Sequence, residues 1–382
     1  MSSPTSNGSA SGIPGLGLEP VRGIRANIIS WDSGGLGVDI DVLTRALVRA
    51  GCSVDFKGRP ERRPRGRLRS LAMTGGALIR RVAAHAGLFR YDVNFFIESV
   101  FPEYLPTAKV NCLFVNPEWF RDANLAHLPR LRVLLCKTPG GVEAMRTLPV
   151  ACREVGFTSP DRRLAVPHDG VLRCLHIAGQ SAVKGSEAVV EVWARHPEWP
   201  RLTVVRRRTR YGGSAAPPLP QLPNVDYLLD RVPDDELQAL QNSSAIHVQP
   251  SLAEGYGHVI AEAMSCGALV ITTDASPMNE LVGAERGLLV KVSRVDAHHR
   301  SQLNHVDLDD LERVLGAAIA MPAERRLVMG QAARSWFEQQ DDRFLKAVDR
   351  LLEDLGLRGD RSPRRPSRRP DRNSNQSPER SR

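Results

Sequence analysis

A short strand that runs into a glycine-containing loop and then a helix occurs twice in this chain, and this repeat constrains the fold most. The first copy is a strand over 25–29, the loop WDSGGLG and an amphipathic helix over 40–50. The second is a strand over 172–178, the loop GQSAVKG and a helix over 186–195. Parallel strands need such helical crossovers, whereas hairpins do not. The sequence therefore predicts an α/β fold made of two doubly wound halves.

Further strand patterns support two separate sheets. In the first half they cover 54–56, 93–97, 110–115 and 133–136; in the second they cover 202–205, 225–228, 245–249 and 268–272, with a helix expected between each pair. Because 382 residues exceed one typical core, two domains are expected, with the boundary within 161–170. We predict a disordered N-terminus (1–21), an N-terminal acceptor domain (22–165), a C-terminal donor domain (166–330), a helix returning to the N-terminal domain (331–357) and a disordered basic tail (358–382).

Charge is concentrated outside the predicted cores. The tail from Arg358 holds nine arginines against three carboxylates and no aliphatic or aromatic residue, so burial cannot offset its ordering entropy. It fits either a dispensable solvated extension or a segment that binds RNA or anionic lipid. Seven Lys or Arg residues in 57–69 indicate a solvated loop, with contact to a membrane surface or an acidic acceptor as the alternative.

The chain contains neither an apolar run of about 18 residues nor the pattern of a secretory signal. We therefore expect a cytoplasmic protein, with peripheral membrane contact left open. The six cysteines are scattered, without CxxC pairs or histidines at zinc-ligand spacing, which favours reduced thiols. We identify no metal-binding Asp-x-Asp motif and no His/Asp cluster, so no metal and no cofactor are expected.

The most informative segment is PSLAEGYGHVIAEAMSCGALVIT, which begins at Pro250. A strand ends before Glu254, and a helix is expected to begin near Gly257 and end at Gly267. The free N–H groups at the amino end of a helix attract anions, and glycines let a ligand approach the backbone. Glu262 follows Glu254 by eight residues, about 10 Å along a helix. One carboxylate can therefore hold sugar hydroxyls and the other ribose hydroxyls, with a diphosphate between them.

This segment resembles the retaining, nucleotide-sugar-dependent GT-B glycosyltransferases called group 1 or family 4, whose pattern is PSxxEGFGxxxxEAMxxGxPVI. The resemblance covers residues 170–290 well and the N-terminal half in outline. It implies a GT-B fold, in which two facing Rossmann-like doubly wound domains enclose an interdomain cleft. It further implies that Glu254 is catalytic, by positioning the sugar. Members of this family also carry an acidic residue shortly before the next strand. In this chain Asn279 and Glu280, followed by GLLV from Gly287, resemble that feature.

The family also carries a Gly-Arg and then a Lys-Gly pair that hold the donor phosphates. Here Lys184 matches the lysine and is assigned a catalytic and donor-binding role, whereas Gln180 stands where arginine is usual and brings no charge. An exposed lysine at a helix start is the alternative for Lys184.

Other donor contacts are implied by position within the resembled pattern. His258 either contacts the donor or acceptor or caps the loop, and the loops VNPEWF (115–120) and CKTPGG (136–141) are expected to shape the acceptor side. The remaining residues assigned to donor binding are Gly255, Tyr256, Gly257, Val259 and Glu262 around the helix start, Arg231 and Val232 at the base-contacting turn, and Gly34 and Gly35 in the first glycine loop.

The sequence thus predicts a glycosyltransferase that moves a sugar from a nucleotide-sugar donor to a hydroxyl of a carbohydrate, lipid or small-molecule acceptor. A nucleotide-sugar epimerase of GT-B fold and a non-catalytic sugar-nucleotide-binding protein remain as alternatives. An epimerase would convert the donor without an acceptor, and a binding protein would show no turnover. No nucleic-acid partner is expected, apart from the basic tail.

Overall fold

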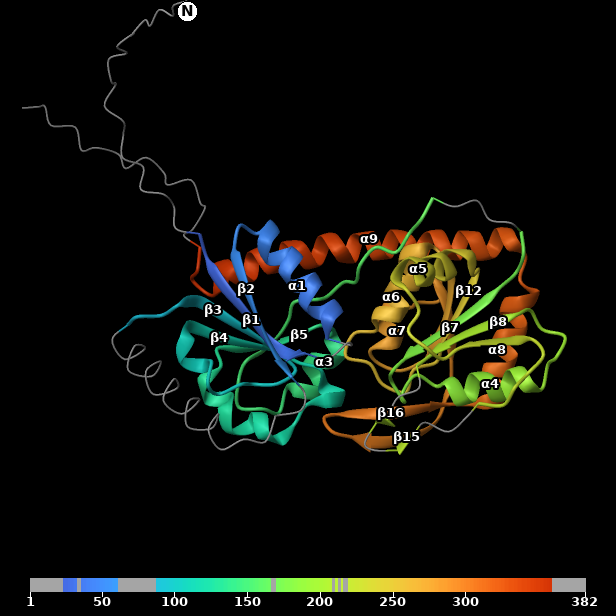
Figure 1. Cartoon of the computed structure of the whole chain (residues 1–382), viewed down its shortest axis with the longest axis horizontal. Coiled ribbons are helices and arrows are strands. Elements are labelled where there is room, and N and C mark those ends of the chain that lie inside the picture. The colour runs from blue at the N-terminus through green and yellow to red at the C-terminus, as the bar shows by residue number, and fades with distance from the viewer. Residues whose placement is uncertain are drawn as a thin grey trace, which may run out of the picture.

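The computed structural model of the chain describes residues 23–32, 36–60, 87–165, 170–207, 210–211, 214–215 and 219–358. Within these ranges the chain forms two α/β domains side by side, with one long helix running along both (Figure 1). Each domain contains a six-stranded sheet in which all pairs are parallel. This confirms the predicted fold class of two Rossmann-like halves.

The N-terminal sheet has the strand order β2-β1-β3-β4-β5-β6. Its central strands are buried over most of their length, as expected for parallel strands covered on both faces. The strands are β1 (Arg25–Asp32), β2 (Ser53–Pro60), β3 (Tyr91–Ile97), β4 (Ala108–Phe114), β5 (Val133–Cys136) and β6 (Cys152–Glu154). The helices are α1 (Gly37–Arg49), α3 (Pro139–Met145) and the 3₁₀ helices η1 (Leu105–Thr107), η2 (Pro117–Trp119) and η3 (Asp122–Arg130).

Three asparagines form a polar row through the interior of this sheet. Asn27, Asn94 and Asn111 occupy matching register positions on β1, β3 and β4. Asn27 Nδ2 donates to Asn94 Oδ1 at 2.9 Å, and Asn94 Nδ2 donates to Asn111 Oδ1 at 2.9 Å. Buried amides without partners are costly, so this row requires the observed register of the three strands.

The C-terminal sheet has the strand order β11-β8-β7-β12-β13-β14. Its strands are β7 (Cys174–Gly179), β8 (Leu202–Arg206), β11 (Val225–Leu228), β12 (Ile246–Gln249), β13 (Leu269–Thr273) and β14 (Gly287–Val290). The helices are α4 (Ser186–Ala194), α5 (Asp234–Ser243), α6 (His258–Cys266), α7 (Met278–Leu281) and α8 (Leu308–Ala320). Two small antiparallel pairs are added, β9 (Arg210–Tyr211) with β10 (Ser214–Ala215), and β15 (Val292–His298) with β16 (Ser301–Val306).

Helix α9 (Ala323–Asp354) packs on both domains (Figure 1). Near its start, a Cβ at Gly330 would lie 1.9 Å from the carbonyl oxygen of Gly267, so the two backbones touch. Farther along, Arg334 forms a two-pronged ion pair with Asp161, at 2.5 and 2.8 Å. The ring of Phe344 packs on Phe157 with centroids 5.0 Å apart. The helix therefore holds the two domains in one arrangement.

The structure departs from the sequence predictions at several places, and strand β6, which was not predicted, is one of them. Between β8 and β11 the described residues contain the β9–β10 pair instead of the expected helix. The β15–β16 hairpin was not predicted, because its exposed strands lack a clear apolar pattern. Helix α9 begins at Ala323, before the predicted start at residue 331. The predictions for residues 1–21, for most of the basic loop and for the tail from residue 359 lie outside the described residues.

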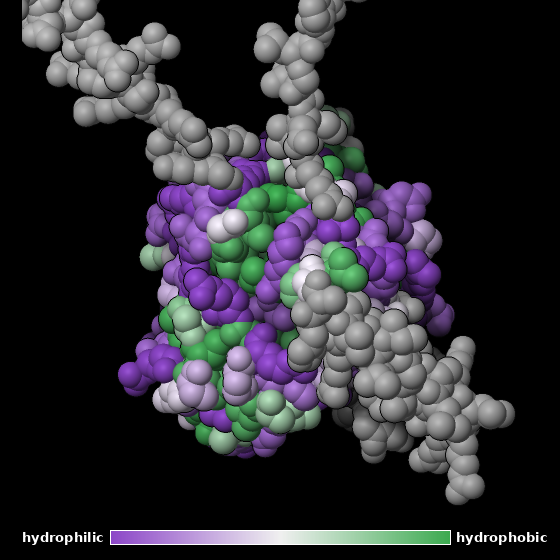
Figure 2. All heavy atoms as spheres, turned by 90° about the vertical axis from the view of Figure 1, so that its left-hand side faces the viewer, coloured by the Kyte–Doolittle hydropathy of each residue, from purple (hydrophilic) through white to green (hydrophobic). Residues whose placement is uncertain are grey.

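The six cysteines are free thiols, four of them buried, as their scattered spacing predicts. Within the described ranges, no helix combines the length and the apolar character that crossing a bilayer would require. Figure 2 looks at the end of the N-terminal domain, where hydrophilic residues surround smaller areas of hydrophobic ones. This end of the molecule is thus mainly a polar surface.

Candidate active site

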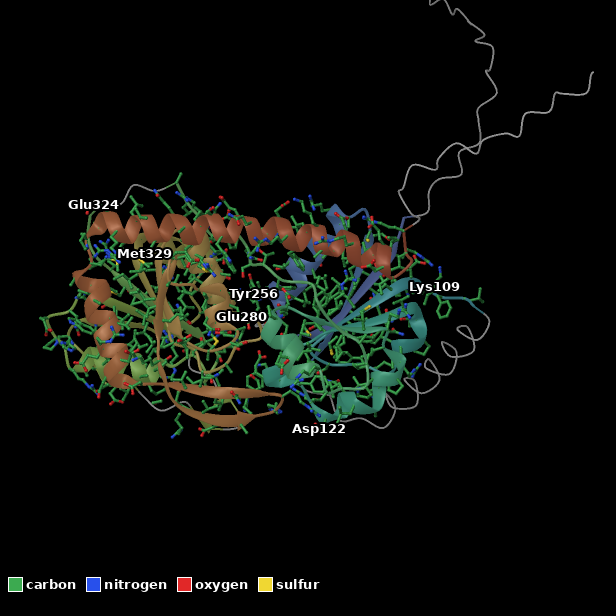
Figure 3. The ribbon with its side chains drawn as sticks, turned by 180° about the vertical axis from the view of Figure 1, so that it is seen from behind. Lys109, Asp122, Tyr256, Glu280, Glu324 and Met329 are labelled. Atoms are coloured by element: carbon green, nitrogen blue, oxygen red, sulfur yellow. The ribbon has the colours of Figure 1, made fainter. Side chains whose placement is uncertain are left out.

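The strands of both sheets end at the face where the two domains meet. Loops after β1, β4 and β5 contact loops after β12 and β13 across this face. In Figure 3, Tyr256 and Glu280 lie between the two sheets, whereas Lys109 and Glu324 lie at opposite ends of the molecule. Open parallel sheets bind ligands at the carboxyl ends of their strands, so this face is the expected place for a site.

Two glycines determine where helix α6 begins and ends. Gly257 precedes the helix with φ of +107°, and Gly267 follows it with φ of +77°, a region that residues with side chains rarely adopt. The amino end of α6 therefore lies at the domain boundary, directly after the turn that carries Glu254. A helix start in this position offers N–H groups and a positive dipole end to an anion.

Lys184 and Glu254 meet at this turn. Lys184 Nζ lies 2.5 Å from Glu254 Oε1, and Ser251 Oγ donates to the same oxygen at 2.6 Å. The two charged side chains are only 14% and 8% exposed. Gly185 allows this approach, because a Cβ there would lie 2.2 Å from the carbonyl oxygen of Pro250. The structure thus brings together the two residues to which the sequence assigned catalytic roles, as a largely buried ion pair.

Glu262 has different partners. Its Oε2 accepts a hydrogen bond from Gln241 Nε2 at 2.8 Å, and Gln241 Oε1 accepts one from Arg162 Nε at 2.8 Å. Burial raises the pKa of Glu262 above its usual range, although His258, Gln241 and Arg162 oppose the shift. Glu254 thus lies in the turn before α6 and Glu262 lies on α6 itself. The two carboxylates belong to separate hydrogen-bond networks.

A second charged cluster joins the two domains next to the start of α6. Asp39 of α1 accepts a hydrogen bond from Lys137 Nζ at 2.6 Å and lies 2.9 Å from His258 Nε2. The other ring nitrogen of His258 lies 2.7 Å from Ser159 Oγ. Lys137 also packs its ammonium 4.7 Å from the ring centroid of Phe157. Residues from α1, from the loop after β5, from the segment joining the domains and from α6 thus form one network.

Electrostatics make Asp39 an anion in this network. Burial alone would raise its pKa, but Lys137 and then His258 hold the pKa of Asp39 well below its usual range. An ionised carboxylate only accepts hydrogen bonds, so His258 Nε2 must be the donor. The other ring nitrogen, Nδ1, pairs with the Ser159 hydroxyl. His258 is therefore held by partners in the folded protein and is not simply a loop cap.

The apolar residues among the predicted donor contacts pack into the protein interior. Tyr256 is buried, and its ring meets Phe157 edge-on with centroids 5.6 Å apart. Val232 and Val259 pack against one small apolar cluster that includes Ile177. These residues therefore shape the turn and its surroundings through packing.

Two further predicted donor residues have side chains that are exposed to solvent. Gln180 follows β7 and is exposed, and so is Arg231, which follows β11. Both stand after the carboxyl ends of strands, where the prediction put them. Gly34 and Gly35 lie outside the described residues.

The two loops expected on the acceptor side both meet the C-terminal domain: the loop 115–120 meets the Glu254 turn, and the loop 136–141 meets α7. A Cβ at Gly255 would lie 2.5 Å from Asn116 Oδ1 and 2.8 Å from Glu118 Oε1. The N–H of Gly140 donates to Glu280 Oε1 at 3.0 Å. A side chain at position 255 would therefore displace the ends of the Asn116 and Glu118 side chains.

Sequence reasoning missed Asp39 and Glu98. Asp39 lies two residues beyond a glycine at the start of a helix, a position where an acidic residue usually just complements the helix dipole. Glu98 follows β3 with φ of +65°, which is unusual for a residue with a side chain. A carboxylate directly after a buried apolar strand was the available signal for Glu98.

In the part of the chain that the structure describes, no three His, Cys, Asp or Glu side chains are grouped so that they could hold a metal ion. Beside the Glu254 turn, Lys184, Lys137 and the start of α6 offer positive charge.

Comparisons with known proteins agree with this geometry. Residues 222–318, which include the Glu254 turn and α6, match the family model described as glycosyl transferases group 1. A stretch of 69 residues is 41% identical to O-antigen chain mannosyltransferase B of Escherichia coli. The matched stretch spans 18% of this chain and 18% of that relative.

Similarity to solved structures extends over almost the whole chain. HepE from Anabaena in complex with UDP and glucose superimposes with a TM-score of 0.64 at 15% identity, covering 88% of this chain and 100% of that one. Sucrose-phosphate synthase from Thermosynechococcus elongatus gives a TM-score of 0.64 at 16% identity, covering 87% and 99%. At such identities the likeness establishes the fold. The chain therefore has the GT-B fold, and its residues 222–318 are similar to the group 1 glycosyltransferases.

Proposed function

We propose that this chain transfers a sugar from a nucleotide-sugar donor to an acceptor hydroxyl, with retention of configuration at the anomeric carbon. The observation that carries the proposal is the meeting of Lys184 and Glu254 beside the amino end of α6, where the family model also matches. A mannosyltransferase among the relatives and UDP with glucose in a structural neighbour both fit a hexose donor.

The ion pair suggests how a donor would be accepted. Without a donor, Lys184 and Glu254 neutralise each other, which limits the cost of keeping two charges mostly buried. A diphosphate would compete for Lys184 as a stronger anion, and Glu254 would then be free to accept hydrogen bonds from sugar hydroxyls. A nucleotide sugar carries both replacement groups in one molecule, whereas free phosphate or free sugar carries only one.

The chemical step depends on stabilising the leaving group. As the bond between the anomeric carbon and the diphosphate oxygen breaks, negative charge grows on the phosphate, where Lys184 and the α6 amino end stabilise it. The acceptor oxygen forms its new bond to the anomeric carbon on the same face, and its proton passes to the departing phosphate. Because protein groups supply the positive charge, we propose that no metal or cofactor takes part, and a chelator should leave the rate unchanged.

The other predicted residues receive supporting roles in this proposal. Glu262 would take the ribose hydroxyls after exchanging its bond with Gln241, and Gln180 would donate to a phosphate oxygen. Arg231 lies where the nucleobase would be, and the loop with Gly34 and Gly35 would approach the phosphate from the N-terminal domain.

The test begins with a donor screen. The melting temperature of the purified protein is measured with UDP, GDP, ADP and dTDP sugars, because a ligand that binds the folded state raises it. Turnover of the best donor is then measured for Lys184→Ala, Glu254→Ala and Glu262→Ala. We expect Lys184→Ala to lower kcat about 100-fold or more.

The matched control is Lys109→Ala, which removes an exposed lysine at the outer edge of the N-terminal domain (Figure 3). Asp92 keeps Arg25 as a partner in that variant, so its activity should be unchanged. Unaltered donor binding and turnover in all three site variants would refute the proposal.

A further inference from the structure

The loop after β4 presents two buried polar side chains to the donor turn. Asn116 and Glu118 are 6% and 5% exposed, and both point an oxygen at Gly255 from the opposite domain. Glu118 also lies close enough to Lys137, Glu254 and Glu98 to interact with their charges. This loop therefore faces the proposed sugar site from the N-terminal side.

Both side chains keep an oxygen without a hydrogen-bond partner. Within the described structure, neither Asn116 Oδ1 nor Glu118 Oε2 has one, while the amide nitrogen of Asn116 reaches only Glu98 Oε2, at 3.5 Å. Buried polar atoms are almost always paired, since leaving one unpaired costs about 1–3 kcal/mol. Two such atoms in one loop that faces the donor turn indicate a polar ligand that supplies the missing hydrogens.

The loop is held firmly enough to position a ligand. The N–H of Trp119 donates to the carbonyl oxygen of Asn116 at 3.0 Å, closing η2, and the N–H of Arg300 in the β15–β16 turn donates to Pro117 at 3.2 Å. The rings of Trp119 and His298 pack edge-on with centroids 5.4 Å apart. The unpredicted hairpin thus clamps the loop from the other domain.

The electrostatic environment indicates which group would bind. Burial raises the pKa of Glu118 to about 8; Lys137 lowers it, and Glu254 and Glu98 raise it further. Near neutral pH the carboxyl is therefore mostly protonated and both donates and accepts hydrogen bonds. An alcohol also does both, whereas a phosphate would meet the negative charge of Glu254. The site fits a hydroxyl better than it fits an anion.

We propose that Asn116 and Glu118 bind the acceptor, that this acceptor is a polyhydroxylated sugar, and that Glu118 orients its attacking hydroxyl. Neighbouring hydroxyls of a sugar would satisfy Asn116 Oδ1 and Glu118 Oε2 together, which a simple apolar alcohol with one hydroxyl would not. This inference rests on the proposed function, because it assigns the second substrate of the same site.

The experiment measures sugar transfer to an acceptor separately from donor binding and donor hydrolysis. With the donor found by the melting screen, donor hydrolysis by water is measured alongside transfer to the methyl glycosides of glucose, galactose and mannose and to 1-octanol. The variants are Glu118→Leu, which removes hydrogen bonding, and Glu118→Gln, which keeps it. Glu143→Leu on α3 is the control, since that glutamate is exposed and pairs only with exposed Arg146 among the described residues.

We expect wild-type protein to prefer at least one methyl glycoside over 1-octanol. Glu118→Leu should lower this transfer by about 10- to 100-fold and leave donor hydrolysis and the donor-induced melting shift unchanged. Glu118→Gln should retain most of the transfer. If Glu118→Leu does not fold, Asn116→Leu and Glu118→Gln provide the same comparison of transfer with hydrolysis.

Three results would overturn the inference: full transfer by Glu118→Leu, an equal fall of transfer and hydrolysis, or a preference for 1-octanol. Each of them leaves the proposed donor chemistry intact, because the wild-type protein would still turn over a nucleotide sugar. A wild-type protein that neither binds nor converts any nucleotide sugar would instead refute the proposed function and this inference together.

Discussion

Asp39 of the N-terminal domain accepts a hydrogen bond from His258 of the C-terminal domain, with 2.9 Å between Oδ1 and Nε2. The same oxygen binds Lys137 at 2.6 Å, so one buried carboxylate joins two domains and neutralises a buried ammonium. Because His258 is the first residue of α6, this contact fixes the helix start on which the proposed donor site depends.

Removing the charge of Asp39 should destabilise the fold. In Asp39→Asn, Lys137 would stay only 3% exposed without a counter-ion, which typically costs about 3–5 kcal/mol. Urea unfolding of the variant would measure this loss. Asp41→Asn, an exposed acid on the same helix, is the control and should change the free energy of unfolding by less than about 0.5 kcal/mol. Equal free energies of unfolding for the two variants would show that Asp39 is not the counter-ion on which buried Lys137 depends.

Acid should destabilise the folded protein because two buried histidines resist protonation. His176 and His247 are fully buried, and burial lowers the pKa of each to about 4. Between pH 6.5 and about 4 the unfolded chain therefore binds more protons than the folded one, so stability falls as pH falls. The slope should reach about 1.4 kcal/mol per pH unit for each histidine.

Measuring the free energy of unfolding across this range would test the effect. His176→Asn should reduce the slope, and the double variant His176→Asn/His247→Asn should reduce it further. Asp39, whose pKa is depressed, adds a separate loss below about pH 4, where the unfolded carboxyl becomes protonated. A slope that is the same in all variants would show that neither histidine is buried in its neutral form.

The lack of a side chain at Gly255 should favour the close contact between this turn and the loop that carries Asn116 and Glu118. In Gly255→Ala, the new Cβ would lie within 3 Å of side-chain atoms of Asn116 and Glu118, so these two side chains must shift. We expect a stability loss of about 1–3 kcal/mol and a higher KM for the donor. Gly316→Ala in α8 is the control: its Cβ would meet only Trp199, at 3.9 Å, and it should stabilise the helix slightly. Wild-type KM and stability in Gly255→Ala would show that the loops are not in contact.

Helix α9 should be coupled to the donor turn through aromatic packing. Phe344 is 1% exposed and packs on Phe157, which in turn packs on Tyr256. Phe344→Ala should cost about 3–5 kcal/mol and weaken donor binding in addition. The exposed neighbour Lys346 provides the control variant Lys346→Ala, which should behave as wild type. Thermal unfolding with and without donor would separate the two effects.

The local pattern of the chain determined its strands where they are apolar and continuous. The bounds of β5 and β11 were predicted without error. In β5 the four residues form a short, fully buried apolar run, which is typical of a parallel strand. Strand β11 contains Asp226, and only Val225 in it is buried. The β15–β16 hairpin was missed, since its exposed strands mix charged residues and histidines and their role appears only in contact with the N-terminal domain.

The same distinction applies to the site. The sequence by itself determined the turn with Glu254, the glycines around α6 and the position of Lys184 in the loop after β7, because these are local features of the chain. Only the tertiary structure decided that Lys184 pairs with Glu254, that Asp39 meets His258 across 219 positions, and that Glu118 lies against Gly255. Such contacts arise where the carboxyl ends of two separate sheets meet, and no spacing along the chain encodes which loops will face each other there.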